Sequence, residues 1–283
     1  MLYNKRPLTE MLPDGLDFDV EFEPTLVHGK KYVINGATGD YLGVVGDTFN
    51  CANHTDFFSG VYDTVTEHLG EEECKDMTVK WKIAKHNAWA MMDIVLPNVT
   101  ARVETERHTT DIAQRIIALH GIDGSCSNQT YFGAIDFFCT NGMITGDHDK
   151  IRRKNTSNFT MDKFIMDLQR STQSFYSQSE QLQHWAKQSL TNRSVKTMLD
   201  RLLKSETVAD KMMNLYNQET IVRGHNVWAL YSAFTNYATY ADDRSGFKLR
   251  NTGKDTAAVS MFNREQKVSQ WISSAPFQQL IAA

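Results

Sequence analysis

The sequence lacks the segments that carry a chain into or across a membrane. Among its 283 residues, no run approaches the roughly 18 uncharged apolar residues of a membrane-spanning helix. The first 28 residues are acidic and contain no apolar stretch of the kind found in a signal peptide. We therefore expect a cytoplasmic protein without membrane contacts.

Cysteine is scarce and scattered. The four cysteines are Cys51, Cys74, Cys126 and Cys139, and no two are close enough to form the CxxC pair of a zinc ribbon. A disulfide framework is not expected in a chain of this length. We expect reduced, buried thiols that act as small core residues.

The common catalytic and nucleotide-binding signatures are also absent. The sequence contains no GxGxxG, GxxxxGK[ST], GxSxG or HExxH segment, and its nine histidines are scattered. Asp147, His148 and Asp149 could ligate Mg²⁺ or Mn²⁺ only with carboxylates from other elements, and the cations that follow oppose a metal there. We assign no catalytic residue, no metal and no cofactor, and we expect a protein that is not an enzyme.

What is present is an uneven distribution of charge. The net charge is −4, but residues 1–149 hold 11 Lys/Arg and 23 Asp/Glu, a net charge of −12, and residues 150–283 hold 19 and 11, a net charge of +8. Hydrophobic residues make up 41% of the chain, enough for a proper core. An acidic and a basic half favour a polyanion-binding face or head-to-tail self-association.

The residue patterns predict an α+β fold with a small, mostly antiparallel sheet and helices, followed by a helical C-terminal half. Residues 1–29 read as an extended acidic arm, residues 30–149 as the α+β core, and residues 150–283 as a basic helical region packed on that core as one domain. In the core we expect a hairpin over 31–47, a helix over 56–69, strands over 78–85, 88–96, 100–104 and 130–139, and a helix over 107–119. In the C-terminal half we expect helices over 160–189, 194–217, 220–240 and 263–273.

Two groups of cations are candidates for binding phosphates. Lys150, Arg152, Arg153 and Lys154 lie between the last strand and the first long helix, in an expected loop or helix entry. A second bank, formed by Lys80, Lys82 and Lys85, lies within the predicted β-strand 78–85. These lysines could line a groove for a single strand of nucleic acid. The alternative for the first group is a solvated loop, and for the second, lysines that discourage edge pairing.

The segment 225–240 carries an aromatic stripe. Trp228, Tyr231 and Phe234 recur at helical spacing, a pattern typical of a core or a subunit contact. We interpret the stripe as packing, with Arg223 and His225 at its start able to reach solvent.

Three stretches together resemble a known family. They are 33–58, which contains LGVVG; 121–146, which contains Asp123-Gly124-Ser125 and Cys139-Thr140-Asn141-Gly142; and 224–240, with its Trp and Tyr residues. The set is similar to the phage/plasmid-like family of unknown function numbered 932. Members often carry a basic residue two or three positions before the Cys of the central segment, where this chain has Asp136.

The resemblance implies an origin in a phage, a plasmid or an integrative element, and no established activity. If a phage encodes the protein, the expected compartment is the cytoplasm of the host. The layout is similar to that of phage single-strand annealing proteins, which join a small α+β core to helices and assemble into rings or filaments. The first hypothesis is therefore a homo-oligomeric protein that binds single-stranded DNA for annealing or recombination, and its contacts would come from the two cation groups. The alternatives are a non-catalytic assembly or anti-defence protein and, third, a metal-dependent nuclease.

Overall fold

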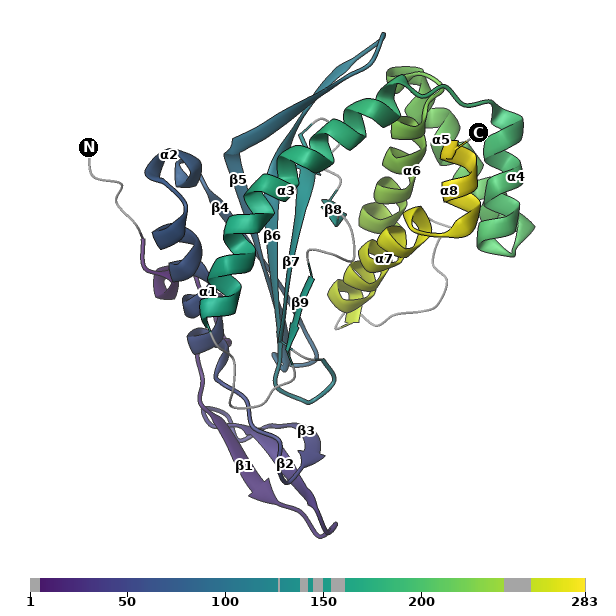
Figure 1. The fold of residues 1–283 in the computed structure, drawn as a ribbon. Coiled ribbons are helices and arrows are strands. Elements are labelled where there is room, and N and C mark those ends of the chain that lie inside the picture. Colours follow the sequence, from purple (N-terminus) through teal and green to yellow (C-terminus); the bar gives the residue numbers. More distant parts are fainter. Residues whose placement is uncertain are drawn as a thin grey trace.

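The computed structural model describes residues 6–126, 128–137, 142–144, 150–153, 161–241 and 256–282 (Figure 1). The order of elements is α+β followed by helices, as predicted. The N-terminal part contains a 3₁₀ turn, three short strands and two helices: η1 (Leu8–Glu10), β1 (Val20–Pro24), β2 (Lys30–Asn35), β3 (Tyr41–Gly46), α1 (His54–His68) and α2 (Glu71–Cys74). The strands of the main sheet are β4 (Thr78–Ala84), β5 (Trp89–Glu104), β6 (Thr109–Gly121), β7 (Asn128–Asp136), β8 (Gly142–Ile144) and β9 (Lys150–Arg153). The helices that follow are α3 (Met161–Lys187), α4 (Asn192–Leu203), α5 (Glu206–Arg223), α6 (Val227–Tyr240), α7 (Ala257–Ile272) and α8 (Ala275–Ala282).

The first three strands form a small antiparallel sheet in the order β1-β2-β3. The hairpin expected over 31–47 is confirmed as β2 and β3, and β1 adds to it from within residues 1–29. Three apolar side chains that precede β1, Leu8, Leu16 and Phe18, are buried. In Figure 1 this sheet lies at the end of the molecule away from the helices α4–α8.

The main sheet is an antiparallel meander, β4-β5-β6-β7, with β8 and β9 both paired to β7. The longest strands, β5 and β6, join through a tight turn in which the amide of Thr105 donates to the carbonyl of His108. Strands predicted over 88–96 and 100–104 are one continuous strand, β5, with an irregular register between Leu96 and Thr100.

The helix predicted over 107–119 is wrong, because this segment is β6. Almost every residue from Ile112 to Gly121 is buried, so the apolar positions show no period that separates a helix from a strand. Pairing with β5 on one side and β7 on the other determines the strand, since both partners supply backbone hydrogen bonds along its length. Distant neighbours, and not local propensity, decide this element.

Helices cover both faces of the main sheet. On one face, Met92, Ile94, Ile116 and Phe132 belong to the large core that α1 and α3 share. On the other face, Tyr131, with Met91 and Leu119, packs against Met261 and Phe262 of α7. The long helix α3 crosses the first face and then continues to the helices α4–α8 (Figure 1).

The C-terminal helices surround α6. Trp228, Tyr231 and Phe234 are buried, so the aromatic stripe is core, as interpreted. The single helix predicted over 194–217 is two helices, α4 and α5, because the chain turns at Lys204, whose φ is 51°. Among the described residues, no helix is long and apolar enough to span a bilayer.

The left-handed conformation of Lys204 gives a first prediction. Glycine adopts this conformation without a Cβ penalty, so Lys204→Gly is expected to raise the free energy of unfolding by up to about 1 kcal/mol. Lys211→Gly, inside α5, is the matched control and is expected to lower it by about 1 kcal/mol. Urea unfolding of both variants measures the difference, and equal destabilisation by both would contradict the assigned turn.

Candidate functional site

Two of the family-like stretches meet at one end of the main sheet. Gly43 in β3 lies so close to the loop between β6 and β7 that a Cβ placed on it would be 3.1 Å from the Cβ of Asp123. Gly124 of that loop has a φ of 76° and faces Val45 of β3 in the same way. The LGVVG and Asp-Gly-Ser segments are therefore in direct contact, and both need glycine at the point of approach.

A lysine of the β4–β5 turn forms a hydrogen-bonded group with an aspartate and a serine of this loop, which we call the turn cluster (Lys85, Asp123 and Ser125). The Lys85 Nζ lies 3.1 Å from Asp123 Oδ2 and 2.5 Å from Ser125 Oγ. The other oxygen of Asp123 accepts from both the amide and the hydroxyl of Ser125. The cluster thus ties the β4–β5 turn to the β6–β7 loop, and it carries ammonium and hydroxyl donors at a partly exposed edge.

The β4–β5 turn is held in an unusual backbone conformation. Lys85, His86 and Asn87 have φ angles of 55°, 51° and 69°, all in the left-handed region. Three such residues in a row are uncommon for non-glycine residues and persist only where their surroundings hold them. Lys85 is held by Asp123, and the carbonyl of Asn87 accepts a hydrogen bond from His54 Nε2 at 2.8 Å.

A buried pair of histidines lies beneath this turn. The Nδ1 atoms of His54 and His120 are 2.9 Å apart, and the rings pack against Phe57 and Phe58. Because Nε2 of His54 donates to a carbonyl, its Nδ1 is the acceptor in the neutral ring, and the Nδ1 of His120 is the donor. Burial lowers the pKa of His54 to about 4 and lowers that of His120 well below its ordinary value. Both rings are therefore neutral at pH 7.

A small pocket of about 240 Å³ lies between the turn cluster and α7. Its polar lining includes Lys85, Ser125 and the amide side chains of Gln129 and Gln266, and its apolar lining includes Trp89 and Phe262. The hydroxyl of Tyr131 is hydrogen-bonded to both glutamines. Sequence reasoning did not detect this pocket, because its residues come from three separate segments of the chain, 85–89, 119–129 and 259–266.

The two other lysines of the second bank differ in their surroundings. Lys80 is exposed on β4, whereas Lys82 is half-buried beneath α7 with its Nζ 2.8 Å from Met261 Sδ. Burial lowers the pKa of Lys82 below its ordinary value, and the nearby carboxylate of Glu265 offsets only part of this effect. The three lysines thus form no continuous exposed row: Lys82 is covered, and Lys85 is bound in the turn cluster.

The first cation group lies in a strand and not in the expected loop. Lys150, Arg152 and Arg153 belong to β9, which pairs with β7, whereas Lys154 lies outside the described residues. The change has a physical reason: the free edge of β7 offers backbone donors and acceptors that a strand satisfies.

The sheet register aligns the two cation groups. Successive pairings put Lys150 in the same cross-strand row as Lys80, and Arg152 in the same row as Lys82. Four interstrand steps separate β4 from β9, about 19 Å at about 4.8 Å per step. Between them α7 covers part of the sheet, so the cations border it at opposite edges.

A buried arginine fixes α7 to the sheet. Arg115 of β6 donates two hydrogen bonds to Asp93 of β5, at 2.7 and 2.6 Å, and one to Glu265 of α7 at 2.9 Å. Burial works to lower the pKa of Arg115, but the two carboxylates raise it above its ordinary value. A Cβ on Gly142 would overlap this guanidinium, which explains the glycine at the end of the central family-like segment.

A second buried arginine fixes α5 to the sheet. Arg223 donates to Asp136 of β7 and to Glu219 of its own helix, both at 2.6 Å. The expectation that Arg223 reaches solvent is wrong, because its side chain is 1% exposed, whereas His225 is exposed as expected. Asp136, where the family often has a basic residue, serves here as the acceptor for this arginine.

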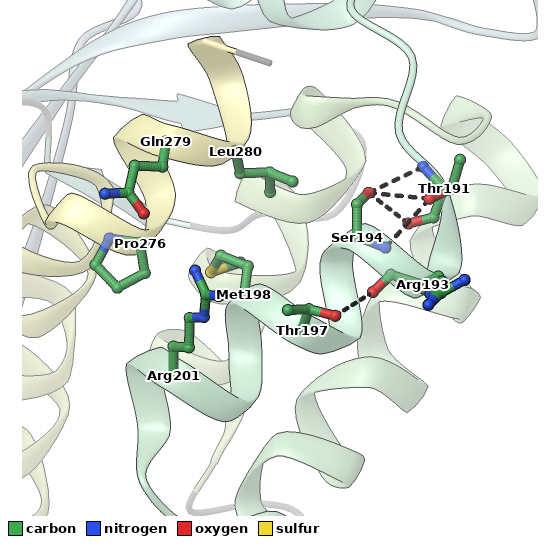
Figure 2. A pocket seen from close by; sticks show the side chains of 9 residues that line it. All are labelled: Thr191, Arg193, Ser194, Thr197, Met198, Arg201, Pro276, Gln279 and Leu280. Carbon is green, nitrogen blue, oxygen red and sulfur yellow. Dashed lines mark hydrogen bonds between the residues drawn. The ribbon is translucent and has the colours of Figure 1, made fainter.

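Two further hollows are lined by cations. One, of about 350 Å³, lies between α4 and α8, and Figure 2 shows Arg201 extending toward Pro276 and Gln279 with Arg193 at the other end. The other, of about 780 Å³, lies between the β5–β6 turn, the end of α3 and the α5–α6 junction. We call this second hollow the hairpin groove. Its cations are single residues in separate elements, so no charged run in the sequence indicates them.

No group of three or more metal-ligating side chains occurs in the described ranges. The acidic trio Asp147, His148 and Asp149 lies outside them. The histidine pair has one imidazole nitrogen, Nε2 of His120, that is buried without a hydrogen-bond partner among the described residues.

Comparison with known proteins gives one match. A family model described as Domain of unknown function (DUF932) matches residues 41–265. No curated protein matches the chain, and no solved structure does. The matched range contains the turn cluster, both buried arginines and the hairpin groove.

The buried Arg115 leads to a stability prediction. Glu265→Gln removes one of its two carboxylates, while Asp93 still pairs with the guanidinium, so the free energy of unfolding is expected to fall by about 2 kcal/mol, the contribution of a buried hydrogen bond between charged groups. Asp111→Asn, which breaks the exposed pair with Arg102, is the matched control, and solvent screening of this pair makes its expected effect much smaller. Equal losses of unfolding free energy in the two variants, measured by urea unfolding, would show that burial gives the Arg115 ion pair no additional stabilising effect.

The histidine pair leads to a prediction about pH. The folded pKa of His54 lies below that of a free histidine, so the unfolded chain takes up the proton first as the pH falls. Stability is then complete above about pH 6.5 and is lost toward pH 4, by about 1.4 kcal/mol per pH unit for each histidine. His54→Gln should reduce the slope of the free energy of unfolding against pH by the contribution of one proton, about 1.4 kcal/mol per pH unit. The exposed control His225→Gln should leave this slope unchanged. Urea unfolding at pH 7 and pH 5 tests both, and an unaltered slope in His54→Gln would refute the assignment.

Proposed function

The chain belongs to the family described as a domain of unknown function, DUF932, and we propose that it is a single-stranded nucleic-acid-binding protein. We propose further that it acts as a homo-oligomer in annealing or recombination. The observation that carries the proposal is the position of Lys150, Arg152 and Arg153 in an edge strand of the main sheet. Residues two apart in a strand lie on the same face, so Lys150 and Arg152 recur at about 7 Å there, which suits a regularly charged polymer.

The surroundings of β9 support this proposal. Arg152 pairs with Gln129 across the ladder, and Gln129 lines the small pocket together with Lys85 and Ser125 of the turn cluster. Cations, hydroxyl groups and amides thus lie within one region at one end of the sheet. Cations and hydroxyls contact phosphate oxygens, and amide groups hydrogen-bond to base edges.

Annealing makes modest chemical demands. It requires a surface that binds one strand through its phosphates and an assembly that extends this surface, and it requires no nucleophile. The opposite net charges of the two halves of the chain supply an electrostatic attraction between copies arranged head to tail. Single-stranded DNA and further copies of this chain are the partners that this proposal names.

Binding to a fluorescein-labelled oligodeoxythymidine, measured by anisotropy between about 50 and 200 mM salt, tests the proposal. The affinity should fall as the salt concentration rises. Lys150→Gln/Arg152→Gln, at two positions on the same face of the strand, should lower the slope of log K against log salt by about 1.4, because each phosphate contact on a single strand contributes about 0.7. Lys30→Gln/Lys75→Gln, which removes two exposed cations elsewhere, is the matched control and should leave the slope unchanged.

Absence of binding at low salt, or binding that does not depend on salt, would overturn nucleic-acid binding. Arg152→Glu/Arg153→Glu provides a second test, with light scattering after size exclusion in the absence of DNA. If this charge reversal breaks the assembly, the cations of β9 belong to a subunit interface, and the assembly-protein alternative replaces the proposal.

A further inference from the structure

The third family-like stretch begins at the hairpin groove with Gly224, His225 and Asn226. Gly224 has a φ of 81°, which explains the glycine. Asn226 caps α6 by accepting from the amide of Ala229, and its amide group donates to the carbonyl of Arg223. His225 differs from both, because its side chain is exposed and lines the groove.

The walls of the groove are held in fixed positions. Gln183 of α3 forms two hydrogen bonds with the backbone of Glu104 at the end of β5, at 2.7 and 2.9 Å. The linkers before α4 and α6 pair with each other, since the amide of Leu190 donates to the carbonyl of His225 at 2.9 Å. The floor is formed by Arg223, which the buried carboxylates of Asp136 and Glu219 hold. The groove is therefore pre-formed, and binding a ligand requires little rearrangement.

Its lining combines cations with hydrogen-bonding groups. Arg107 from the β5–β6 turn and Lys187 from the end of α3 are both exposed beside His225. The guanidinium of Arg107 also donates to the carbonyl of Thr220 at 3.4 Å, which orients it along the wall. Two glutamates, Glu104 and Glu106, and the hydroxyls of Thr105 and Ser189 also line it, whereas its two amide side chains are already bound to backbone groups of the walls. Cations suit a phosphate, and carboxylate and hydroxyl acceptors suit the donors of a sugar and a base.

We propose that the hairpin groove binds one phosphate and its nucleoside in a nucleic-acid strand, with Arg107, Lys187 and His225 contacting the phosphate. This inference rests on the proposed function. A volume of about 780 Å³ is within the range of small-ligand sites and accommodates a nucleotide unit.

The groove and β9 lie at different ends of the sheet, which fixes the length of strand that reaches both. Ile117 shares the row of Lys150, and Thr109, where β6 begins, pairs with Glu104 at the groove. The two rows are eight residues of β6 apart, about 27 Å at about 3.4 Å per residue, and β9 lies two interstrand steps, about 10 Å, to the side of β6. The resulting distance of about 29 Å is spanned by about 9 nucleotides of a strand stacked at about 3.4 Å per nucleotide.

The test compares Arg107→Gln/Lys187→Gln with the control Lys30→Gln/Lys75→Gln on long and short labelled oligodeoxythymidines. All four positions are exposed, and unchanged thermal unfolding midpoints verify folding. With an oligonucleotide of roughly 16 nucleotides, the groove variant should lower the salt slope by about 0.7, the contribution of the one phosphate that the groove binds. With one of roughly 4 nucleotides, bound at β9, it should leave the slope unchanged.

The outcomes separate the two proposals. No binding of any oligonucleotide by the unmodified protein overturns the proposed function and the groove assignment with it. Salt-dependent binding that Arg107→Gln/Lys187→Gln leaves unchanged at both lengths overturns the groove assignment alone. Titration with inorganic phosphate and with thymidine monophosphate forms the third arm: tight binding of either one, lost in the groove variant, would identify a site for a free small ligand instead of a strand.

Discussion

Two buried guanidinium groups connect the sheet to the helices, and the positions of the surfaces depend on them. Arg115 joins β5 and β6 to α7, and Arg223 joins α5 to β7. A buried charge that loses its partner costs several kcal/mol, so neither helix can shift on the sheet without a large penalty. Each arginine also has two carboxylate partners. Because the donors of a guanidinium lie in one plane at fixed angles, two partners set the orientation of the helix on the sheet as well as its distance.

This constraint shapes the regions where a ligand can bind. Because Glu265 fixes α7, this helix covers Lys82 and leaves the cations of β4 and β9 at opposite edges of the sheet. Because Arg223 fixes the end of α5, the α5–α6 junction stands beside the β5–β6 turn and closes the hairpin groove. The proposed contacts with nucleic acid therefore lie at the ends and edges of the sheet.

The family-like segments acquire physical roles in this arrangement. Gly43 permits the contact between the small sheet and Asp123, and Gly142 leaves room for Arg115. The strained turn at Lys85 is held by Asp123 and by the histidine pair. The contacts of Gly43, Lys85 and the histidine pair organise one end of the main sheet, whereas Gly142 and Arg115 lie further along its strands.

The sequence by itself determined the α+β order, the helix over 56–69, the β2–β3 hairpin and the buried aromatic face of α6, because each has a local period or a turn signal. Only the tertiary structure decided that 107–119 is a strand and that Lys150–Arg153 pairs with β7, because both depend on backbone partners far away in the chain. The same holds for the candidate sites. The charged run was visible in the sequence, but the burial of Arg223 and Lys82 and the meeting of Arg107, Lys187 and His225 in one groove were not. Burial and proximity are properties of packing, and no local pattern of residue types encodes them.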